Sequence, residues 1–155
     1  MYYTSSWSPP SIKRAGMDGS NPTILVTGGL LWPFGITIDF QTSKLFWADN
    51  DASKIESSDL KGGDRRTVAN LSGAGPLGIA YGNGRIYWGE DSTKKLQSSA
   101  IDGSDVTTLH TDTRAVWGVT LVADLNLPQN RTNHCASHGC AKVCVLTPTS
   151  SRCLT

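Results

Sequence analysis

The sequence has no long apolar run and almost no excess of charge. Its 14 basic and 13 acidic side chains give a formal net charge of +1, so there is no basic field to attract nucleic acid. A bilayer-spanning helix needs about 20 apolar residues in succession, and the apolar stretch Gly35–Phe40 is far shorter. Residues Met1–Ser6 lack the basic region and apolar core of a signal peptide. A helical period is also missing, so no long helix is expected.

Cysteine is absent from most of the chain and then occurs four times near its end. An even number of cysteines in a short polar tail predicts disulfides formed in an oxidising compartment. Two sequons, at Asn70 and Asn130, are candidate N-glycosylation sites and fit the same compartment. A third asparagine, Asn21, is excluded by Pro22. The tail therefore predicts an extracellular or cell-surface location. Its cysteines are Cys135, Cys140, Cys144 and Cys153.

Four short patterns recur three times in the same order, which is the signature of a repeat architecture. The first is an aromatic-led tetrapeptide, and its copies begin at Tyr2, Phe46 and Tyr87, so the spacing is 44 and then 41 residues. An apolar-led segment, an Asp-Gly or Lys-Gly turn and a longer apolar stretch follow each time. The copies of the apolar-led segment are Ile12–Ala15, Ile55–Ser58 and Leu96–Ser99. The copies of the turn are Asp18-Gly19, Lys61-Gly62 and Asp102-Gly103, and those of the longer apolar stretch are Pro33–Asp39, Pro76–Gly82 and Val116–Val122.

Each repeat is composed of short strands. Ile36–Asp39 and Lys44–Trp47 are rich in β-branched and aromatic residues and are separated by a polar turn. In the next copy the turn is Gly82-Asn83-Gly84, a strong hairpin signal. Outer strands are predicted at Thr23–Val26, Arg66–Ala69 and Val106–Leu109. Four strands in about 40 residues match one propeller blade, so the sequence predicts an all-β fold of close to three antiparallel sheets around a shared axis.

The aromatic-led tetrapeptide, the Asp-Gly turn and the Pro-X-Gly stretch resemble the YWTD (class B) repeats of the low-density lipoprotein receptor and receptor-related proteins. This resemblance implies a six-bladed β-propeller, of which residues 1–124 would supply about three blades, followed by an epidermal-growth-factor-like (EGF-like) module in residues 125–155. In the family, the tetrapeptide acid and an arginine of the next strand help to join blades. Only Arg14 matches that arginine, so regular bonding between blades is not expected.

The tail resembles the start of an EGF-like module, cut short before its last cysteine. The resemblance implies the disulfides Cys135–Cys144 and Cys140–Cys153. A zinc site is the alternative, with Cys135, Cys140 and Cys144 joined by His134 or His138; only two of its cysteine spacings suit structural zinc. Unpaired thiols are the remaining alternative.

Three repeats do not close a six-bladed ring, and a half ring exposes an apolar flank. We therefore expect the chain to be a fragment of a longer receptor. The alternative is that two such chains assemble into one ring. Any membrane attachment would then come from parts of the parent protein outside this sequence.

Among the aromatic residues, Trp47 and Trp88 occupy the repeated core position and are predicted to be buried. Trp32 has no counterpart at Gly75 or Ala115. It precedes an inner strand, where loops form the mouth of a propeller and binding residues concentrate. Trp32 and Phe34 are therefore the candidate partner contacts, with local packing as the alternative for Trp32. Trp117 shares the repeat position of Phe34 and Leu77, so packing between blades is predicted for it.

Catalysis has little support in the sequence. His110 has no repeated acidic or nucleophilic partner, and no nucleophile-elbow motif is present. Some six-bladed propellers are calcium-dependent lactonases, and Asp39, Asn50 and Asp91 are the candidate ligands for such a site. The repeat places Gly82 and Val122 where Asp39 stands, which argues against it.

We therefore predict a binding protein without catalytic residues, metal or cofactor. Its role would be that of a receptor ectodomain that binds secreted proteins through the propeller face. The alternative is a matrix glycoprotein of nidogen type, because such proteins also carry YWTD propellers next to EGF-like modules.

Overall fold

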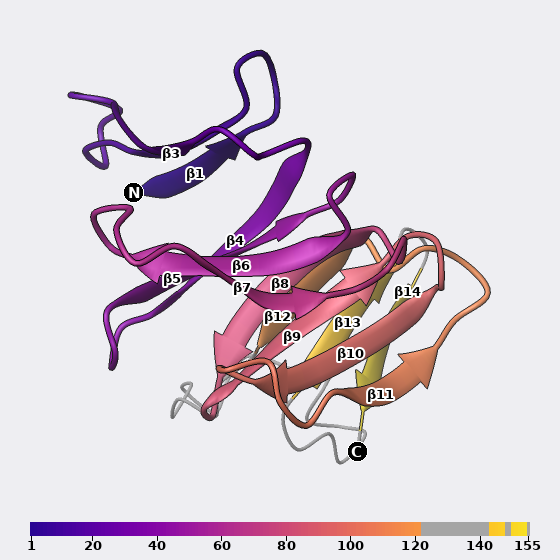
Figure 1. Ribbon diagram of the computed structural model, residues 1–155. Coiled ribbons are helices and arrows are strands. Elements are labelled where there is room, and N and C mark those ends of the chain that lie inside the picture. The colour runs from indigo at the N-terminus through magenta and orange to yellow at the C-terminus, as the bar shows by residue number, and fades with distance from the viewer. Residues whose placement is uncertain (122–142, 148–149, 155) are drawn as a thin grey trace.

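A computed structural model describes residues 1–121, 143–147 and 150–154, and all regular structure within these ranges is β-strand. The strands are antiparallel and lie in four sheets, and the first three sheets follow one another in chain order (Figure 1). The prediction of an all-β fold without helix is confirmed for these residues. None of them forms a helix that could cross a membrane.

The first three sheets hold the three copies of the tetrapeptide and are called blades 1, 2 and 3 below; each Pro-X-Gly stretch, placed last in the predicted repeat, is instead the first strand of the next sheet. Blade 1 has the order β1-β2-β3, blade 2 the order β4-β5-β6-β7, and blade 3 the order β11-β10-β9-β8. Each strand thus pairs with the next one in sequence. The bounds are β1 Tyr2–Ser5, β2 Ser11–Arg14, β3 Thr23–Thr27, β4 Pro33–Asp39, β5 Lys44–Asp49, β6 Lys54–Asp59, β7 Arg66–Asn70, β8 Pro76–Gly82, β9 Arg85–Glu90, β10 Lys95–Ala100 and β11 Thr107–Thr111.

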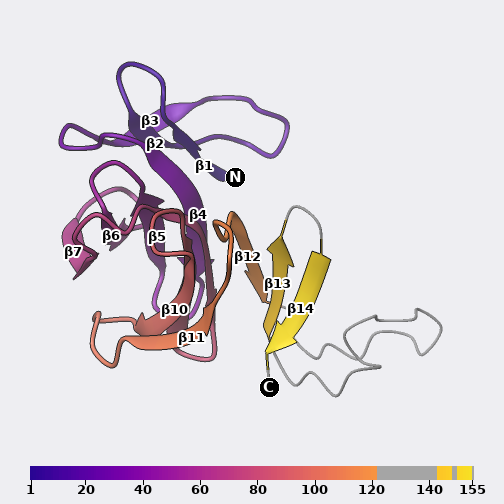
Figure 2. The same ribbon diagram turned by 90° about the vertical axis from the view of Figure 1, so that its right-hand side faces the viewer.

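The fourth sheet joins the last repeat strand to the tail. It contains β12 (Gly118–Leu121), β13 (Val143–Thr147) and β14 (Ser150–Leu154), which lie side by side in Figure 2. Cys144 of β13 lies opposite Cys153 of β14 in the backbone register. The predicted partners Cys135 and Cys140 lie outside the described residues, as do the sequon at Asn130 and the domain boundary after residue 124.

Turn chemistry fixes the hairpins as the sequence predicts. Gly82 pairs with Arg85, so only Asn83 and Gly84 connect β8 to β9. Both connecting residues have positive φ, 52° and 72°, which is the requirement of a type I′ turn. An asparagine tolerates this conformation better than most residues, and a glycine adopts it without steric cost. The predicted Asn-Gly hairpin is therefore confirmed.

The core lies between the blades, because the second strand of each blade alternates its side chains between the two neighbouring blades. In β5, Leu45 and Trp47 pack with Ile12 and Val26 of blade 1. Phe46 of the same strand instead joins a cluster with blade 3. Both Trp47 and Trp88 are fully buried, as predicted. Apolar side chains buried on both faces of blade 2 thus hold it against blades 1 and 3.

The inner strands β4, β8 and β12 approach one another closely at a repeated glycine. A Cβ atom on Gly35 would lie 2.6 Å from the carbonyl oxygen of Leu77, and one on Gly78 would lie 2.7 Å from that of Trp117. Such distances are too short for a side chain, so only glycine permits this spacing. The glycine of the Pro-X-Gly pattern therefore sets how closely adjacent blades pack around the axis.

Candidate functional site

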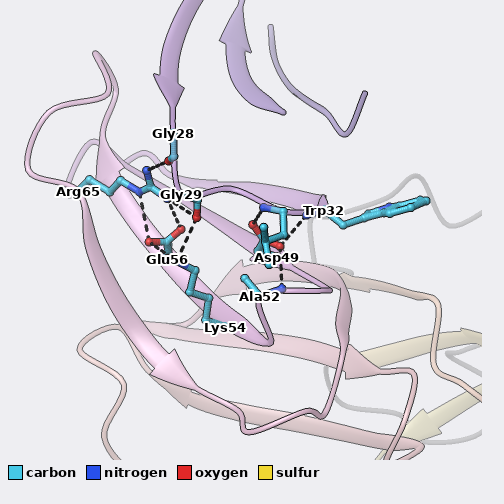
Figure 3. Close-up of polar contacts among 9 residues, drawn as sticks. Gly28, Gly29, Trp32, Asp49, Ala52, Lys54, Glu56 and Arg65 are labelled. Atoms are coloured by element: carbon cyan, nitrogen blue, oxygen red, sulfur yellow. Dashed lines mark hydrogen bonds and ion pairs between the residues drawn. The ribbon is translucent and has the colours of Figure 1, made fainter. Parts of the chain in front are cut away.

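The loop that leads from blade 1 into β4 is held by a buried acid. Asp49, the acid of the second tetrapeptide, is fully buried. Its carboxylate accepts hydrogen bonds from the backbone amides of Leu31 (2.9 Å), Trp32 (2.8 Å) and Ala52 (3.1 Å) (Figure 3). Carboxylate bonds to backbone N–H groups are among the stronger hydrogen bonds in proteins. The backbone of Trp32 is therefore fixed, while its indole extends away from the carboxylate.

A groove of about 410 Å³ opens beside this loop. Its lining comes from β1, from the residues that follow β1 and from the entry into β4. Three of the lining side chains are large and solvent-exposed aromatics: Trp7 (85% exposed), Trp32 (47%) and Phe34 (39%). The structure thus brings together the two predicted contact residues, Trp32 and Phe34, and adds Trp7. The full lining is Tyr3, Thr4, Ser5, Ser6, Trp7, Trp32, Pro33 and Phe34.

Trp117 extends the same aromatic surface, contrary to the packing predicted for it. Its side chain is 51% exposed, and its ring meets that of Phe34 edge-on, with 6.5 Å between centroids. Leu77, which has the same repeat position in blade 3, is buried. The burial implied by the packing predicted for Trp117 is therefore not found, although the equivalent Leu77 is buried. We call Trp7, Trp32, Phe34 and Trp117 the aromatic cluster.

Trp7 is the member of the cluster that sequence reasoning missed. The signal was available, because Trp7 does not recur at the equivalent positions, Asp51 and Ser92. A large aromatic residue that the repeat does not require for packing is the criterion that selected Trp32. The same criterion selects Trp7.

Polar contacts connect blade 1 to the start of β4. The Ser6 hydroxyl donates to the Pro33 carbonyl at 2.6 Å, and the Thr4 hydroxyl donates to the Phe34 carbonyl at 2.7 Å. At the next joint, the Asn50 amide lies 3.5 Å from the Pro76 carbonyl. Ser6 and Asn50 occupy the same repeat position, as do Pro33 and Pro76. The entries into β4 and β8 are therefore each held by the blade before them.

Bonding between blades 1 and 2 also uses an arginine that the family pattern did not indicate. Arg65 donates to the carboxylate of Glu56 (2.8 and 3.2 Å) and to the Gly28 carbonyl (2.6 Å) (Figure 3). Lys54 lies 3.2 Å from the same carboxylate. Arg65 also lies over the Trp47 ring, 5.8 Å from its centroid, within range of a cation–π contact.

The expectation that bonding between blades would not be regular agrees with this arrangement, because blades 1 and 2 are bonded through Arg65 and not through Arg14. Arg14 is exposed. The repeat position of Arg65 holds Pro22 in blade 1 and Val106 in blade 3, so this contact belongs to one joint and could not be found from the repeat.

The tetrapeptide acid of blade 3 works differently from Asp49. Glu90 is buried, but it accepts from the Trp88 indole (3.0 Å) and the Gln97 amide (2.7 Å) within its own sheet. Its side chain is one methylene longer than that of aspartate. The two acids share a repeat position and burial, and only Asp49 holds an exposed aromatic loop.

The candidate calcium ligands are brought together only in part: Asn50 and Asp91 both lie within 4 Å of the Cβ position of Gly75, whereas Asp39 lies apart from Asn50. Asp39 is the last residue of β4, whereas Asn50 follows Asp49, which pairs with Pro33 at the other end of β4. Seven residues of strand span roughly 20 Å. Among the described residues, no group of three His, Cys, Asp or Glu side chains is placed to hold a metal ion. His110 lies in β11, 3.9 Å from Asp112.

Asp39 instead stabilises the turn that follows β4 and the contact between blades 2 and 3. Burial would raise the pKa of Asp39, but hydrogen bonds from the Thr42 hydroxyl and from the Gln41 and Thr42 amides outweigh it and lower the pKa. Burial, and next the neighbouring Asp39, raise the pKa of Tyr81 in blade 3. Tyr81 also stacks on Phe46 of blade 2 with 6.4 Å between ring centroids. These contacts explain the buried acid without a catalytic role.

Comparison with known proteins agrees with the repeat pattern. Residues 1–40 match the family described as low-density lipoprotein receptor repeat class B. The human low-density lipoprotein receptor-related protein 5 is 30% identical over 149 residues, which cover 94% of this chain and 9% of that receptor. The chain belongs to the YWTD-repeat proteins related to the low-density lipoprotein receptor.

Two further comparisons concern shorter matches and the fold. The vitellogenin receptor of Solenopsis invicta is 46% identical over 67 residues, or 43% of this chain and 4% of that receptor. A chain in a crystal structure of a nidogen/laminin complex is 30% identical, with a TM-score of 0.73 over 78% of this chain and 48% of that chain. The matched part of this chain thus spans a small part of the two receptors and about half of the structural neighbour.

Proposed function

We propose that these YWTD repeats are part of an extracellular receptor that binds secreted proteins through the aromatic cluster. The observation that carries the proposal is the exposure of Trp7, Trp32 and Phe34 along one open groove, with the exposed Trp117 in edge contact with Phe34. Scattered exposed apolar residues are common, but a contiguous aromatic surface on a rigid scaffold is typical of a protein interface. Aromatic anchors of this kind often dominate binding energy.

The sequence relatives support a receptor, because two of them bear receptor names. An ectodomain at the cell surface also accounts for the cysteines of the tail. In this proposal residues 125–155 form an EGF-like module with the disulfides Cys135–Cys144 and Cys140–Cys153. Peptide mapping without reduction tests this part. Linked peptides in the other pairings, or bound zinc, would contradict it.

A matrix role is the second candidate, and one observation favours it. The nidogen/laminin structure is similar to this chain in sequence as well as in fold. In that case the aromatic cluster would bind another matrix protein, and the parent protein would need no membrane anchor. Enzymatic activity has no such support: among the described acids, the buried Asp39, Asp49 and Glu90 are engaged in hydrogen bonds within turns, loops and sheets.

The experiment that tests the proposal measures binding of the 155-residue chain to three purified probes: vitellogenin, low-density lipoprotein and laminin. Biolayer interferometry is run in the presence and absence of a calcium chelator. Binding to vitellogenin or lipoprotein supports the receptor, and binding to laminin alone supports the matrix role. Failure of all three probes to bind would contradict a protein-binding function of this kind.

A further inference from the structure

Asn70 stands at an unusual place in blade 2. It is the last residue of β7, the outermost strand of the blade, and its side chain is exposed. Asn70, Leu71 and Ser72 form a sequon. A sequon inside a buried strand could not keep a glycan in the folded protein, since the oligosaccharide must remain in solvent. Here the strand ends at the acceptor residue.

The chain turns immediately after Asn70 and leaves both reactive side chains free. The backbone amide of Ser72 donates to the Asn70 side-chain oxygen at 3.4 Å. Ser72 and Gly73 have positive φ values of 46° and 83°, which direct the chain away from the strand. Ser72 is exposed. Within the described part of the chain, neither the Asn70 Nδ2 nor the Ser72 hydroxyl has a hydrogen-bond partner.

The segment is fixed by its backbone, so its exposure does not depend on unfolding. The Leu71 amide donates to the Ser53 carbonyl at 2.8 Å, and the Ala74 amide donates to the Leu71 carbonyl at 3.1 Å. Leu71 packs against the cluster between blades 2 and 3. The middle residue of the sequon is thus anchored inward, while Asn70 and Ser72 face solvent.

We propose that Asn70 carries an N-linked oligosaccharide, an inference that rests on the proposed extracellular location. The donor is an oligosaccharide linked through its anomeric carbon to a lipid pyrophosphate. The Asn70 Nδ2 forms a bond to that carbon and loses one proton. The bond between the carbon and the pyrophosphate oxygen breaks, and the lipid pyrophosphate leaves. No oxidant or reductant takes part.

The position gives the glycan a structural consequence. The outer edge of β7 has no strand paired to it in the sheet order of blade 2. An open strand edge can pair with another chain, and bulky or charged groups prevent this. A glycan at the end of β7 would protect this edge. It would also leave the groove accessible, because no residue of β7 lines the groove.

The test directs the 155-residue chain into the secretory pathway of cultured animal cells with a cleavable leader. Protein from the medium and from the cell lysate is treated with peptide N-glycosidase in heavy-oxygen water. Mass spectrometry then reads the peptide that contains Asn70. We expect the isotopic mark of a removed glycan on Asn70 in most molecules. An unmarked Asn70 peptide in both fractions would overturn the inference.

Matched variants separate this site from the second sequon and from misfolding. Ser72→Ala keeps the asparagine but should remove the mark from Asn70, and Asn130→Gln should leave that mark unchanged. Because glycans are added as the chain enters the pathway, the lysate reports on Asn70 even if a variant is not secreted. An unmarked Asn70 in a chain that still binds a probe would end this inference and leave the proposed function intact. A glycan mark on Asn70 in a chain that binds no probe would support the glycosylation site and contradict the proposed function.

Discussion

The carboxylate of Asp49 holds the backbone amide of Trp32 at 2.8 Å. Asp49 is buried within blade 2, and the Trp32 side chain is half exposed on the loop from blade 1. Asp49, which holds a repeated position, therefore fixes the loop that carries Trp32, an aromatic residue without a counterpart in the other copies. This relationship connects the stability of the blades to the geometry of the proposed binding surface.

Replacing Asp49 tests that connection. Asp49→Ala leaves the amides of Leu31, Trp32 and Ala52 without their acceptor, so the free energy of unfolding should fall by about 3 kcal/mol. Asp49→Asn keeps one acceptor oxygen and should cost about half as much. The neighbouring exposed acid provides the control: Asp51→Asn should change stability by less than about 0.5 kcal/mol. Urea unfolding measures all three, and equal effects of the two positions would contradict the assignment.

The contact of Arg65 with Glu56 should matter more than its surface position suggests. Glu56 is 3% exposed, so Arg65→Ala leaves a buried carboxylate with Lys54 alone. We expect a loss of about 1–3 kcal/mol, below the value for a buried pair without a second cation. Arg65→Lys should recover only part of it, since lysine lacks the planar fork. Arg66→Ala is the matched control on an exposed neighbour. A loss with Arg66→Ala equal to that with Arg65→Ala would show that the joint does not depend on this pair.

The glycines of the inner strands give a steric prediction. Gly78→Ala would place a methyl group 2.7 Å from the Trp117 carbonyl and 2.8 Å from the Gly118 Cα, and the backbones must separate to admit it. Overpacking of this kind costs roughly 1–3 kcal/mol. Among the described residues, a Cβ on Gly118 meets nothing within 4 Å, so Gly118→Ala should be close to neutral. Thermal unfolding compares the two, and similar melting temperatures would refute the account of the joint.

The lowered pKa of Asp39 predicts that the free energy of unfolding depends on pH in the acid range. An unperturbed aspartate has a pKa of 3.8, and the fold lowers the pKa of Asp39 below that value. Its contribution is therefore fully present above the unfolded pKa and is lost as the pH falls toward the folded pKa. Asp39→Asn should be less stable than the wild type at neutral pH, and the difference should narrow below about pH 4. Unfolding curves at several pH values measure this, with Asp51→Asn as the control. A difference independent of pH would contradict the role of the carboxylate.

The repeat made most of the fold predictable. Spacing placed Trp47 and Trp88 at one core position, and the Asn83-Gly84 turn fixed a hairpin without knowledge of the other blades. Contacts that occur between only one pair of blades could not be predicted from the repeat. Arg65 reaches Gly28 across 37 residues, and no local pattern encodes such a pairing.

The candidate site was predictable for a different reason. Trp32 and Trp7 stand outside the repeat, so packing symmetry does not require them, and both prove to be exposed. Trp117 was misjudged because it lies at a repeated position. At the equivalent Leu77 the side chain is covered, whereas that of Trp117 is half exposed and its ring meets Phe34. A shared repeat position therefore does not by itself determine whether a side chain is buried.

The most direct test of the account is the effect of Trp32→Ala on binding and on stability, measured in the same preparation. An aromatic anchor in an interface contributes about 2 kcal/mol, or roughly thirtyfold in affinity. The account predicts that the Kd for a bound probe rises by about that factor while the melting temperature stays unchanged. Trp47→Ala should instead cost roughly 3–5 kcal/mol of stability, because it empties a buried site. An unchanged Kd for Trp32→Ala, or a fall in its melting temperature like that of Trp47→Ala, would contradict binding through the aromatic cluster.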